Sequence, residues 1–133
     1  MSQVVLDTDV ASYFFNRHSL AELYSKAVRG SDLLLSFMSV AELRAGSLRA
    51  KWGPERRGSL QSFVEDFDVI YADDQLCTTW AELRAAASSM GRPLSPQDAW
   101  IAATAIAVDA PLATNNRRDY ESVGGLRLIT LAS

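Results

Sequence analysis

Near the start of the chain stands Val4-Val5-Leu6-Asp7-Thr8-Asp9, an apolar and mostly β-branched run that gives way to acids. A short run that is apolar throughout is typical of a strand buried on both faces of a sheet. An acid at the end of such a strand is costly unless a cation or hydrogen-bond donors meet it. This stretch therefore predicts a buried first strand that leads straight into a polar site.

Further along the chain, similar apolar runs alternate with segments that carry helix signals. Strands are expected over residues 33–37, 69–71, 112–114 and 126–130. Helices are expected from Ser19 to Gly30, from Ser39 towards Ala50, from Pro54 to about Phe67, from Asp73 or Asp74 to Gly91, and from Ser95 onwards. This alternation predicts a single α/β domain over residues 1–133, with a mainly parallel central sheet of about five strands flanked by helices.

Length and composition set bounds on the class of protein. With 133 residues, 48% of them apolar, the chain suits one domain with one core and not a disordered linker. No apolar run approaches the roughly 18 residues of a membrane span, and no signal peptide precedes Asp7, so no membrane partner is expected. The single cysteine, Cys77, cannot form an internal disulfide, which favours the cytoplasm.

The charge balance limits how the chain can bind nucleic acid. Its net charge is −3, which argues against coating nucleic acid through bulk charge. Eleven of its thirteen basic residues are arginine, whose forked side chain suits phosphate. Local clusters must therefore hold any polyanion, and the expected phosphate-binding residues are Arg44, Arg117 and Arg118.

Acidic side chains gather where the predicted strands end. In an open parallel sheet, ligands bind beyond the carboxyl ends of the strands. Asp7 ends the first strand, and Glu42 falls in the first turn of the helix after the second. Asn115 and Asn116 follow the strand at 112–114, with Asp119 one turn beyond.

Asp98 requires a further step. Only Ala110 and Pro111 separate its helix from the strand at 112–114, so this helix must descend to the base of that strand. A helix of about ten residues is roughly 15 Å long, comparable with the strand and its flanks. The start of the helix, and Asp98 with it, is therefore expected at the same edge as the other acids.

Each acid also has a plain structural explanation. Glu42 and Asp98 both sit three residues after a serine and could complete capping boxes. Asp9 could cap a helix, and Asp119 could end a turn. These explanations hold one at a time, but together they do not account for the shared edge.

A cluster of carboxylates predicts a hard divalent cation. Clustered carboxylates repel one another and raise each other's pKa unless a cation lies among them. All-oxygen ligands suit Mg²⁺ or Mn²⁺, and one histidine with one cysteine cannot build a usual zinc site. The chemistry typical of such a site is phosphoryl transfer, in which the metal activates water and neutralises charge on a phosphate.

Four segments carry these acids, and their order and spacing are specific. The segments are Val4-Val-Leu-Asp-Thr-Asp9, Ser39-Val-Ala-Glu-Leu-Arg-Ala-Gly46, Asp98-Ala-Trp-Ile-Ala-Ala-Thr-Ala105 and Leu112-Ala-Thr-Asn-Asn-Arg-Arg-Asp-Tyr120. Together they resemble the motifs of PIN-domain ribonucleases, and in particular those of the VapC-type toxins of bacterial toxin–antitoxin operons. The resemblance covers nearly the whole chain.

The resemblance implies roles for individual residues. By it, Asp7, Glu42 and Asp98 bind the metal and carry catalysis. Many similar proteins have a fourth acid directly after the strand at 112–114, where this chain has asparagines, so the fourth position falls to Asn115, Asn116 or Asp119, of which Asp119 is the acid. Supporting roles, such as orienting the carboxylates, fall to Thr8, Asp9, Ser39, Thr114, Asn115 and Asn116.

The implied activity is metal-dependent cleavage of single-stranded or looped RNA, with tRNA and rRNA as candidates. The resemblance also implies a homodimer, and a cognate antitoxin that blocks the site in a heterotetramer or larger assembly.

Other interpretations stay open. A non-catalytic PIN-like module would bind RNA or protein without metal. The segment that starts with Asp7 is also similar to that of haloacid-dehalogenase-type phosphatases, but these need a lysine in the site, and Lys26 and Lys51 lie outside the late motifs. A histidine-based ribonuclease needs a second histidine besides His18.

Overall fold

The computed structural model describes residues 2–132, along which strands and helices alternate. The strands are β1 (Gln3–Leu6), β2 (Asp32–Ser36), β3 (Asp68–Ile70), β4 (Leu112–Ala113) and β5 (Leu128–Ile129). The helices are α1 (Thr8–Asn16), α2 (Ala21–Ala27), α3 (Phe37–Arg49), α4 (Pro54–Glu65), α5 (Asp74–Ser89), α6 (Pro96–Ala107) and α7 (Arg117–Tyr120). The predicted α/β class is confirmed.

The five strands form one parallel sheet in the order β3-β2-β1-β4-β5. β1 lies at its centre, with Leu6 paired to Leu35 of β2 and to Ala113 of β4. From β1 the chain crosses to β2 on one side, whereas from β4 it continues to β5 on the other. The carboxyl ends of β1 and β4 are therefore the switch point of the sheet, where folds of this kind bind their ligands.

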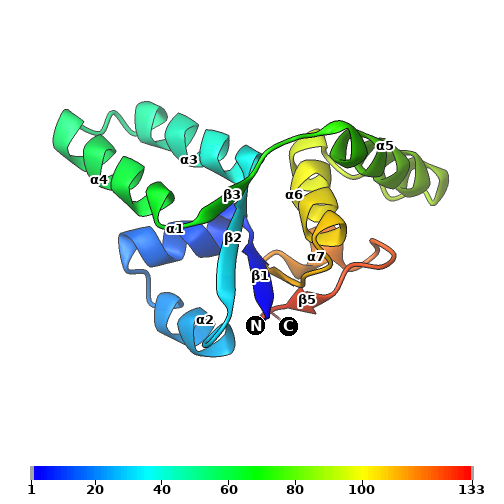
Figure 1. Cartoon of the computed structure of the whole chain (residues 1–133), viewed down its shortest axis with the longest axis horizontal. Helices are drawn as coiled ribbons and strands as arrows, with labels where there is room; N and C mark the ends of the chain where they lie inside the picture. The colour runs from blue at the N-terminus through cyan, green and yellow to red at the C-terminus, as the bar shows by residue number, and fades with distance from the viewer. Residues whose placement is uncertain (1, 133) are drawn as a thin grey trace.

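Alternate side chains of the strands face two helical layers. Val4 and Leu6 belong to a core packed against α1 to α4, while Val5 and Leu112 belong to a core packed against α6 and α7. Figure 1 shows α1 to α4 on one side of the sheet and α5 to α7 on the other. Because both faces are covered, the strands are apolar except at some of their first and last residues. No helix among the described residues is long and apolar enough to cross a membrane.

Two helices, α1 and α7, lie outside the predicted set. α1 follows β1 at once, and its N-cap is Asp7, whose side chain accepts a hydrogen bond from the Thr8 N–H. Asp9, considered above as a cap, lies within the first turn of this helix. Only Asp7 separates α1 from β1, so no turn marks the start of this helix in the sequence. α7 is a single turn, too short to show any period.

The predicted helix start at Ser19 is wrong. α2 begins at Ala21, and its N-cap residue, Leu20, makes no side-chain capping bond within the described structure. The backbone N–H of Leu20 donates to Nδ1 of His18 (3.0 Å), so an imidazole replaces the expected serine. The helix also ends before Gly30, which turns the chain into β2 with a φ of 81°.

The predicted start of the next helix, at Ser39, is also wrong. The N-cap of α3 is Ser36, whose hydroxyl accepts the N–H of Met38, so this helix begins where β2 ends. Glu42 consequently lies in the second turn of α3, too deep in the helix to complete a cap. Two other predicted caps are confirmed: Asp73 on α5 and Ser95 on α6.

One buried hydroxyl joins three segments near the carboxyl edge of the sheet. Tyr24, on α2, is fully buried. Its hydroxyl lies 3.1 Å from the carbonyl oxygen of Thr114 and 2.8 Å from Oδ1 of Asn115. It also accepts a hydrogen bond from the N–H of Leu131 (3.1 Å). α2 is thereby tied to the end of β4 and to the segment after β5.

Replacing Tyr24 by Phe should lower the free energy of unfolding by about 1–3 kcal/mol, because buried polar groups lose their partner. Urea unfolding followed by circular dichroism measures the change. The matched control is Tyr71→Phe, since Tyr71 is 72% exposed and its variant should differ by less than about 0.5 kcal/mol. Equal stability of the two variants would contradict the role of the Tyr24 hydroxyl.

Candidate functional site

The acid at the end of β1 is met by donors from three elements. Asp7 is only 4% exposed. Its Oδ1 accepts the backbone N–H of Thr8 (2.8 Å) and lies 3.2 Å from the hydroxyl of Tyr120. Its Oδ2 accepts the hydroxyl of Thr114 (2.7 Å). The start of α1, the end of β4 and α7 therefore close around one carboxylate at the switch point.

Tyr120 connects Asp7 to Asp98. Its ring is buried, and its hydroxyl lies 3.2 Å from Oδ1 of Asp7 and 3.1 Å from Oδ1 of Asp98. The N–H of Asp98 donates to the capping hydroxyl of Ser95 (3.1 Å). The serine is thus the cap of α6, and the Asp98 carboxylate approaches the acid of β1 at the edge where the sequence predicts it.

Glu42 reaches the same region through Thr8. The hydroxyl of Thr8 donates to Oε1 of Glu42 (2.7 Å) and lies 2.9 Å from the hydroxyl of Ser39. Because Thr8 directly follows Asp7, this network brings the second turn of α3 to the end of β1. Thr8 therefore hydrogen-bonds directly to the Glu42 carboxylate, and Ser39 is connected to that carboxylate through Thr8.

Asp9 and Asn115 hold the end of β4 against the start of α1. Oδ2 of Asp9 accepts the backbone N–H of Asn115 (3.0 Å), and Oδ1 accepts that of Val10 (2.7 Å). The side-chain amide of Asn115 donates to the hydroxyl of Tyr13 (3.3 Å), and its Oδ1 lies against Tyr24. Both side chains are therefore engaged in supporting contacts.

The exposed carboxylate beside Asp98 is that of Asp119. Asn116 is exposed, and its backbone N–H donates to the hydroxyl of Thr114 (3.0 Å). Asp119, on α7, lines the same cavity as Asp98, and its negative charge contributes to raising the pKa of the Asp98 carboxyl. The geometry thus places Asp119 next to the cluster, and its role as a ligand stays a prediction.

Tyr120 belongs to the site but was not predicted from the sequence. A buried tyrosine needs a partner for its hydroxyl, and this tyrosine directly follows an acid in a motif rich in polar residues. That is the one available signal, since its contact with Asp7 spans 113 positions of the chain.

Burial shifts three acids, Asp7, Asp9 and Asp98, towards their protonated forms. Burial, and after it the charge on Asp9, raises the pKa of the Asp7 carboxyl from 3.8 to about 7, although hydrogen bonds to its oxygens oppose the shift. Burial also raises the pKa of Asp9 and of Asp98. Buried against two acids, the phenol of Tyr120 has its pKa raised far above its usual range, so it stays a donor. The cluster is short of positive charge.

The cluster has the chemistry of a divalent-cation site without a preformed geometry. Asp7, Glu42 and Asp98 offer only oxygen donors, which Mg²⁺ and Mn²⁺ prefer, and a cation would offset the charge that burial leaves uncompensated. Within residues 2–132, no three Asp, Glu, His or Cys side chains converge as a ready set of ligands. The hydroxyls of Tyr120 and Thr8 take up contacts with the acids instead. The three carboxylates suit a hard cation once the hydroxyls of Tyr120 and Thr8 move away from them.

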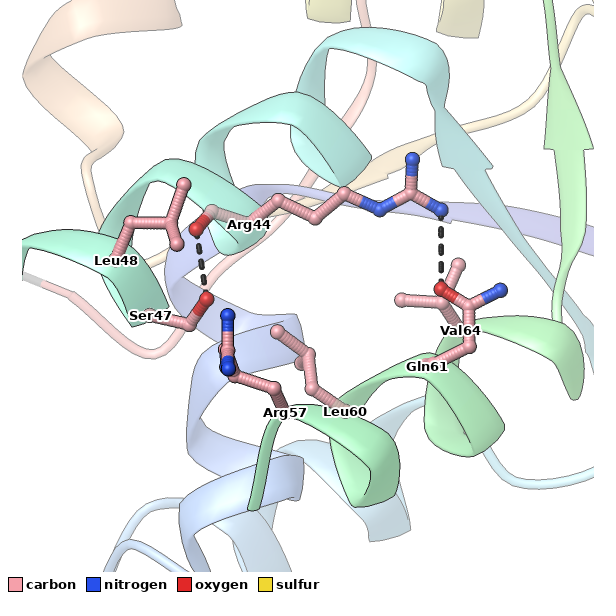
Figure 2. Close-up of a pocket in the computed structure, with 7 residues that line it drawn as sticks. All are labelled: Arg44, Ser47, Leu48, Arg57, Leu60, Gln61 and Val64. Atoms are coloured by element: carbon pink, nitrogen blue, oxygen red, sulfur yellow. Dashed lines mark hydrogen bonds between the residues drawn. The ribbon is translucent and has the colours of Figure 1, made fainter. Parts of the chain in front are cut away.

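Arg44, predicted to bind phosphate, lies outside the acid cluster. Figure 2 shows it extending from α3 towards Gln61 on α4, and its Nη2 donates to Oε1 of Gln61 (3.3 Å). The two helices enclose a groove of about 220 Å³, in which Arg57 points towards Ser47. Its apolar walls are Leu48, Leu60 and Val64. Because Arg44 stands two residues after Glu42, it projects from a different face of α3.

Arg117 and Arg118, neighbours in the sequence, have different surroundings. Nε of Arg117 pairs with Oε2 of Glu121 (3.3 Å), one turn further along. Arg118 takes part in none of the ion pairs found between residues 2 and 132, and it lines the cavity that contains Asp98 and Asp119. Of the three predicted arginines, Arg118 is the one that lies beside the acids.

A family model described as PIN domain matches residues 4–126 of the chain. Ribonuclease VapC1 of Haemophilus influenzae (strain R2866) is 26% identical to it over 92% of this chain and 93% of the relative. The tRNA(fMet)-specific endonuclease VapC of Shigella flexneri is 27% identical over 96% of both chains. The crystal structure of VapBC2 from Rickettsia felis, bound to a promoter DNA fragment, superposes with a TM-score of 0.83 and 25% identity, over 96% of this chain and 97% of that one. The likeness therefore spans nearly the full length of each relative.

The raised pKa of Asp7 makes the metal-free stability depend on pH. The folded chain keeps a proton that the unfolded chain releases between pH 3.8 and about 7, so the free energy of unfolding should fall as the pH rises through this window. The fall contributed by Asp7 is on the order of 4 kcal/mol at most. Asp7→Asn should flatten the profile and, in chelator at pH 8, melt higher than the wild type.

Thermal melts in EDTA from pH 4 to 8 measure this profile. Glu82→Gln, an exposed change on α5, is the matched control and should keep the wild-type slope. An Asp7→Asn variant with the wild-type slope would show that Asp7 holds no extra proton.

Removing the Tyr120 hydroxyl should lower the free energy of unfolding of the metal-free protein. It should also increase the rise in melting temperature that Mg²⁺ causes. Tyr120→Phe leaves Asp7 and Asp98 without their shared donor, which should cost about 1–3 kcal/mol in chelator. Mg²⁺ should then raise the melting temperature more than it does in the wild type, because no hydroxyl has to move aside. Calorimetry with and without Mg²⁺ tests this, and an identical Mg²⁺ response in both proteins would count against it.

Proposed function

The chain belongs to the PIN-domain family, and we propose that it is a metal-dependent endoribonuclease, the toxin of a toxin–antitoxin pair. Relatives named as VapC ribonucleases support the nuclease class. One observation carries the site: Asp7, Tyr120 and Asp98 are linked at the switch point, with Glu42 joined to them through Thr8. Hydrogen bonds through Thr8 and Tyr120 thus link acids from three parts of the chain at the edge where an α/β sheet binds its ligand.

The residues that would hold Mg²⁺ or Mn²⁺ are Asp7, Glu42, Asp98 and Asp119. Such a cation, when bound, supplies activated water and neutralises charge on the phosphate. The surrounding side chains keep the acids in place. Thr8 orients Glu42, and Thr114 fixes the second oxygen of Asp7.

The proposed substrate is single-stranded or looped RNA. The Shigella flexneri relative is named as specific for tRNA(fMet), which makes tRNA the first RNA to test here, followed by rRNA. With a net charge of −3, the chain must hold RNA phosphates by local contacts and not by bulk charge.

The proposed partner is a cognate antitoxin. Relatives of known structure are described as VapBC, and toxin–antitoxin pairing in this chain is the corresponding expectation. We propose that the chain forms a homodimer, that the antitoxin assembles with it into a heterotetramer or larger complex, and that both act in the cytoplasm.

The surroundings of lysine and histidine do not favour the phosphatase and histidine-nuclease alternatives. Lys26 pairs with Glu22 on α2 (3.6 Å), and Lys51 is exposed. His18 stacks on Tyr13, with ring centroids 4.4 Å apart, and its Nδ1 accepts the backbone N–H of Leu20. A non-catalytic PIN-like module is the alternative that the structure does favour in one respect, since the described acids do not converge as a ready ligand set.

Cleavage of RNA decides between these two functions. The wild type should cut a labelled tRNA or single-stranded RNA in Mg²⁺ and leave 5′-phosphate and 3′-hydroxyl ends, because water is the nucleophile. Asp98→Asn should lower the rate by on the order of 100-fold or more, while the exposed control Glu82→Gln leaves it unchanged. Electrophoresis with end-group analysis provides the measurement.

Two outcomes would contradict the proposal. Cyclic 2′,3′-phosphate ends would identify the ribose hydroxyl as the nucleophile, and full activity in chelator would remove the metal from the reaction. RNA binding without any cleavage in Mg²⁺ or Mn²⁺ would favour the non-catalytic module.

A further inference from the structure

A polar cavity of about 320 Å³ opens beside the acid cluster, between the loop that precedes α6 and the helix α7. Its charged and hydroxyl-bearing walls are Arg92, Ser95, Asp98, Arg118, Asp119 and Ser122. The volume lies at the small end of the range for ligand pockets. Because Asp98 also contacts Tyr120, whatever binds in the cavity lies next to the proposed metal ligands.

Two arginines in this cavity have no ionic partner in the described part of the chain. The ion pairs between residues 2 and 132 are Lys26–Glu22, Arg117–Glu121 and Arg127–Asp109. Arg92 and Arg118 are both exposed, and neither lies within ion-pair distance of Asp98 or Asp119, although all four line one cavity. Their guanidinium groups are therefore available to a ligand.

We propose that this cavity binds a phosphate of the RNA strand next to the one that is cleaved, with Arg92 and Arg118 as its cationic contacts. The inference rests on the proposed nuclease function. A guanidinium presents a planar fork of N–H donors that matches phosphate oxygens, and two of them from different segments can hold one phosphate from two sides. The first turn of α6 borders the cavity and adds positive backbone charge.

Through the acids in the cavity, binding of this phosphate depends on binding of a cation at the proposed metal site. Asp98 and Asp119 balance the two arginines in formal charge, so the empty cavity is close to neutral. A cation bound at the acids leaves the arginines in excess and favours a phosphodiester. Phosphate binding in the cavity and cation binding at the acids should therefore strengthen each other.

Arg117 provides a matched control from the same helix. It has the same charge as Arg118 and is its neighbour in the sequence, but Glu121 neutralises it 3.3 Å away, and it does not line the cavity. If RNA binding depended only on the total positive charge near the site, loss of Arg117 and loss of Arg118 would weaken it equally. If the cavity binds a phosphate, only loss of Arg118 or Arg92 weakens RNA binding.

Binding of a fluorescein-labelled, single-stranded RNA of about 12 nucleotides tests the inference, with anisotropy measured over a range of salt in Mg²⁺. All proteins carry Glu42→Gln, so that the RNA stays intact. Arg92→Ala and Arg118→Ala should each weaken binding by about 5- to 10-fold at low salt. The double variant should flatten the log–log salt dependence by about 0.7, the value of one phosphate contact on a single strand. Arg117→Ala should leave the slope unchanged, and Arg118→Lys should retain it.

A second measurement locates the phosphate on the RNA. Single phosphodiesters are replaced, one position at a time, by uncharged methylphosphonates. One position should weaken binding to the protein with both arginines, but should not weaken the double variant further, because the two cations and this phosphate form one contact.

A double variant with the full salt slope would overturn the inference, and so would an equal loss in Arg117→Ala or no measurable RNA binding. Failure of the nuclease function looks different. A chain that binds RNA with the expected slopes but does not cleave it keeps the phosphate site and loses the proposed activity. A chain that cleaves RNA, but whose double variant keeps the full salt slope, has the proposed activity and lacks the phosphate site.

Discussion

Burial of one carboxylate at the end of the central strand constrains the rest of the structure. Asp7 is removed from water, which is costly unless donors meet the charge. They come from the backbone of Thr8, the hydroxyl of Thr114 and the hydroxyl of Tyr120. Since each donor belongs to a different element, satisfying this side chain fixes α1, β4 and α7 against β1. The pKa of Asp7 still lies near 7, so the donors leave a demand for positive charge that a cation would meet.

The topology explains why the functional groups lie at this place. The chain leaves β1 and β4 in opposite directions, and Asp7 and Thr114, which directly follow these two strands, meet in a hydrogen bond of 2.7 Å. Hydrogen bonds then link the acids after β1, on α3 and on α6. Arg92 and Arg118 line a cavity that also contains Asp98. Under the proposed function the acids would hold a cation and the arginines a neighbouring phosphate.

The sequence predicted the positions of Asp7 and Asp98 better than it predicted the helix ends. The run Val4-Val-Leu and the short connection between α6 and β4 were sufficient to place Asp7 and Asp98 at one edge, because burial and chain length allow few alternatives. The start of α3 was misplaced because Ser36 and Ser39 both precede plausible helices, and only packing selects between them. Contacts between distant segments, such as Tyr120 with Asp7, carry no local signal. For the same reason the sequence could not distinguish Arg118 in its cavity from Arg117 in its ion pair.

We propose that the cluster around Asp7 is a cation site held in a hydrogen-bonded form by hydroxyls. A crystal structure of the chain in Mn²⁺, with anomalous scattering recorded at the manganese edge, is the decisive experiment. We expect an anomalous peak between the carboxylates of Asp7 and Asp98, with the Tyr120 hydroxyl withdrawn from at least one of them. The absence of a peak there, with Tyr120 still in contact with both acids, would contradict it.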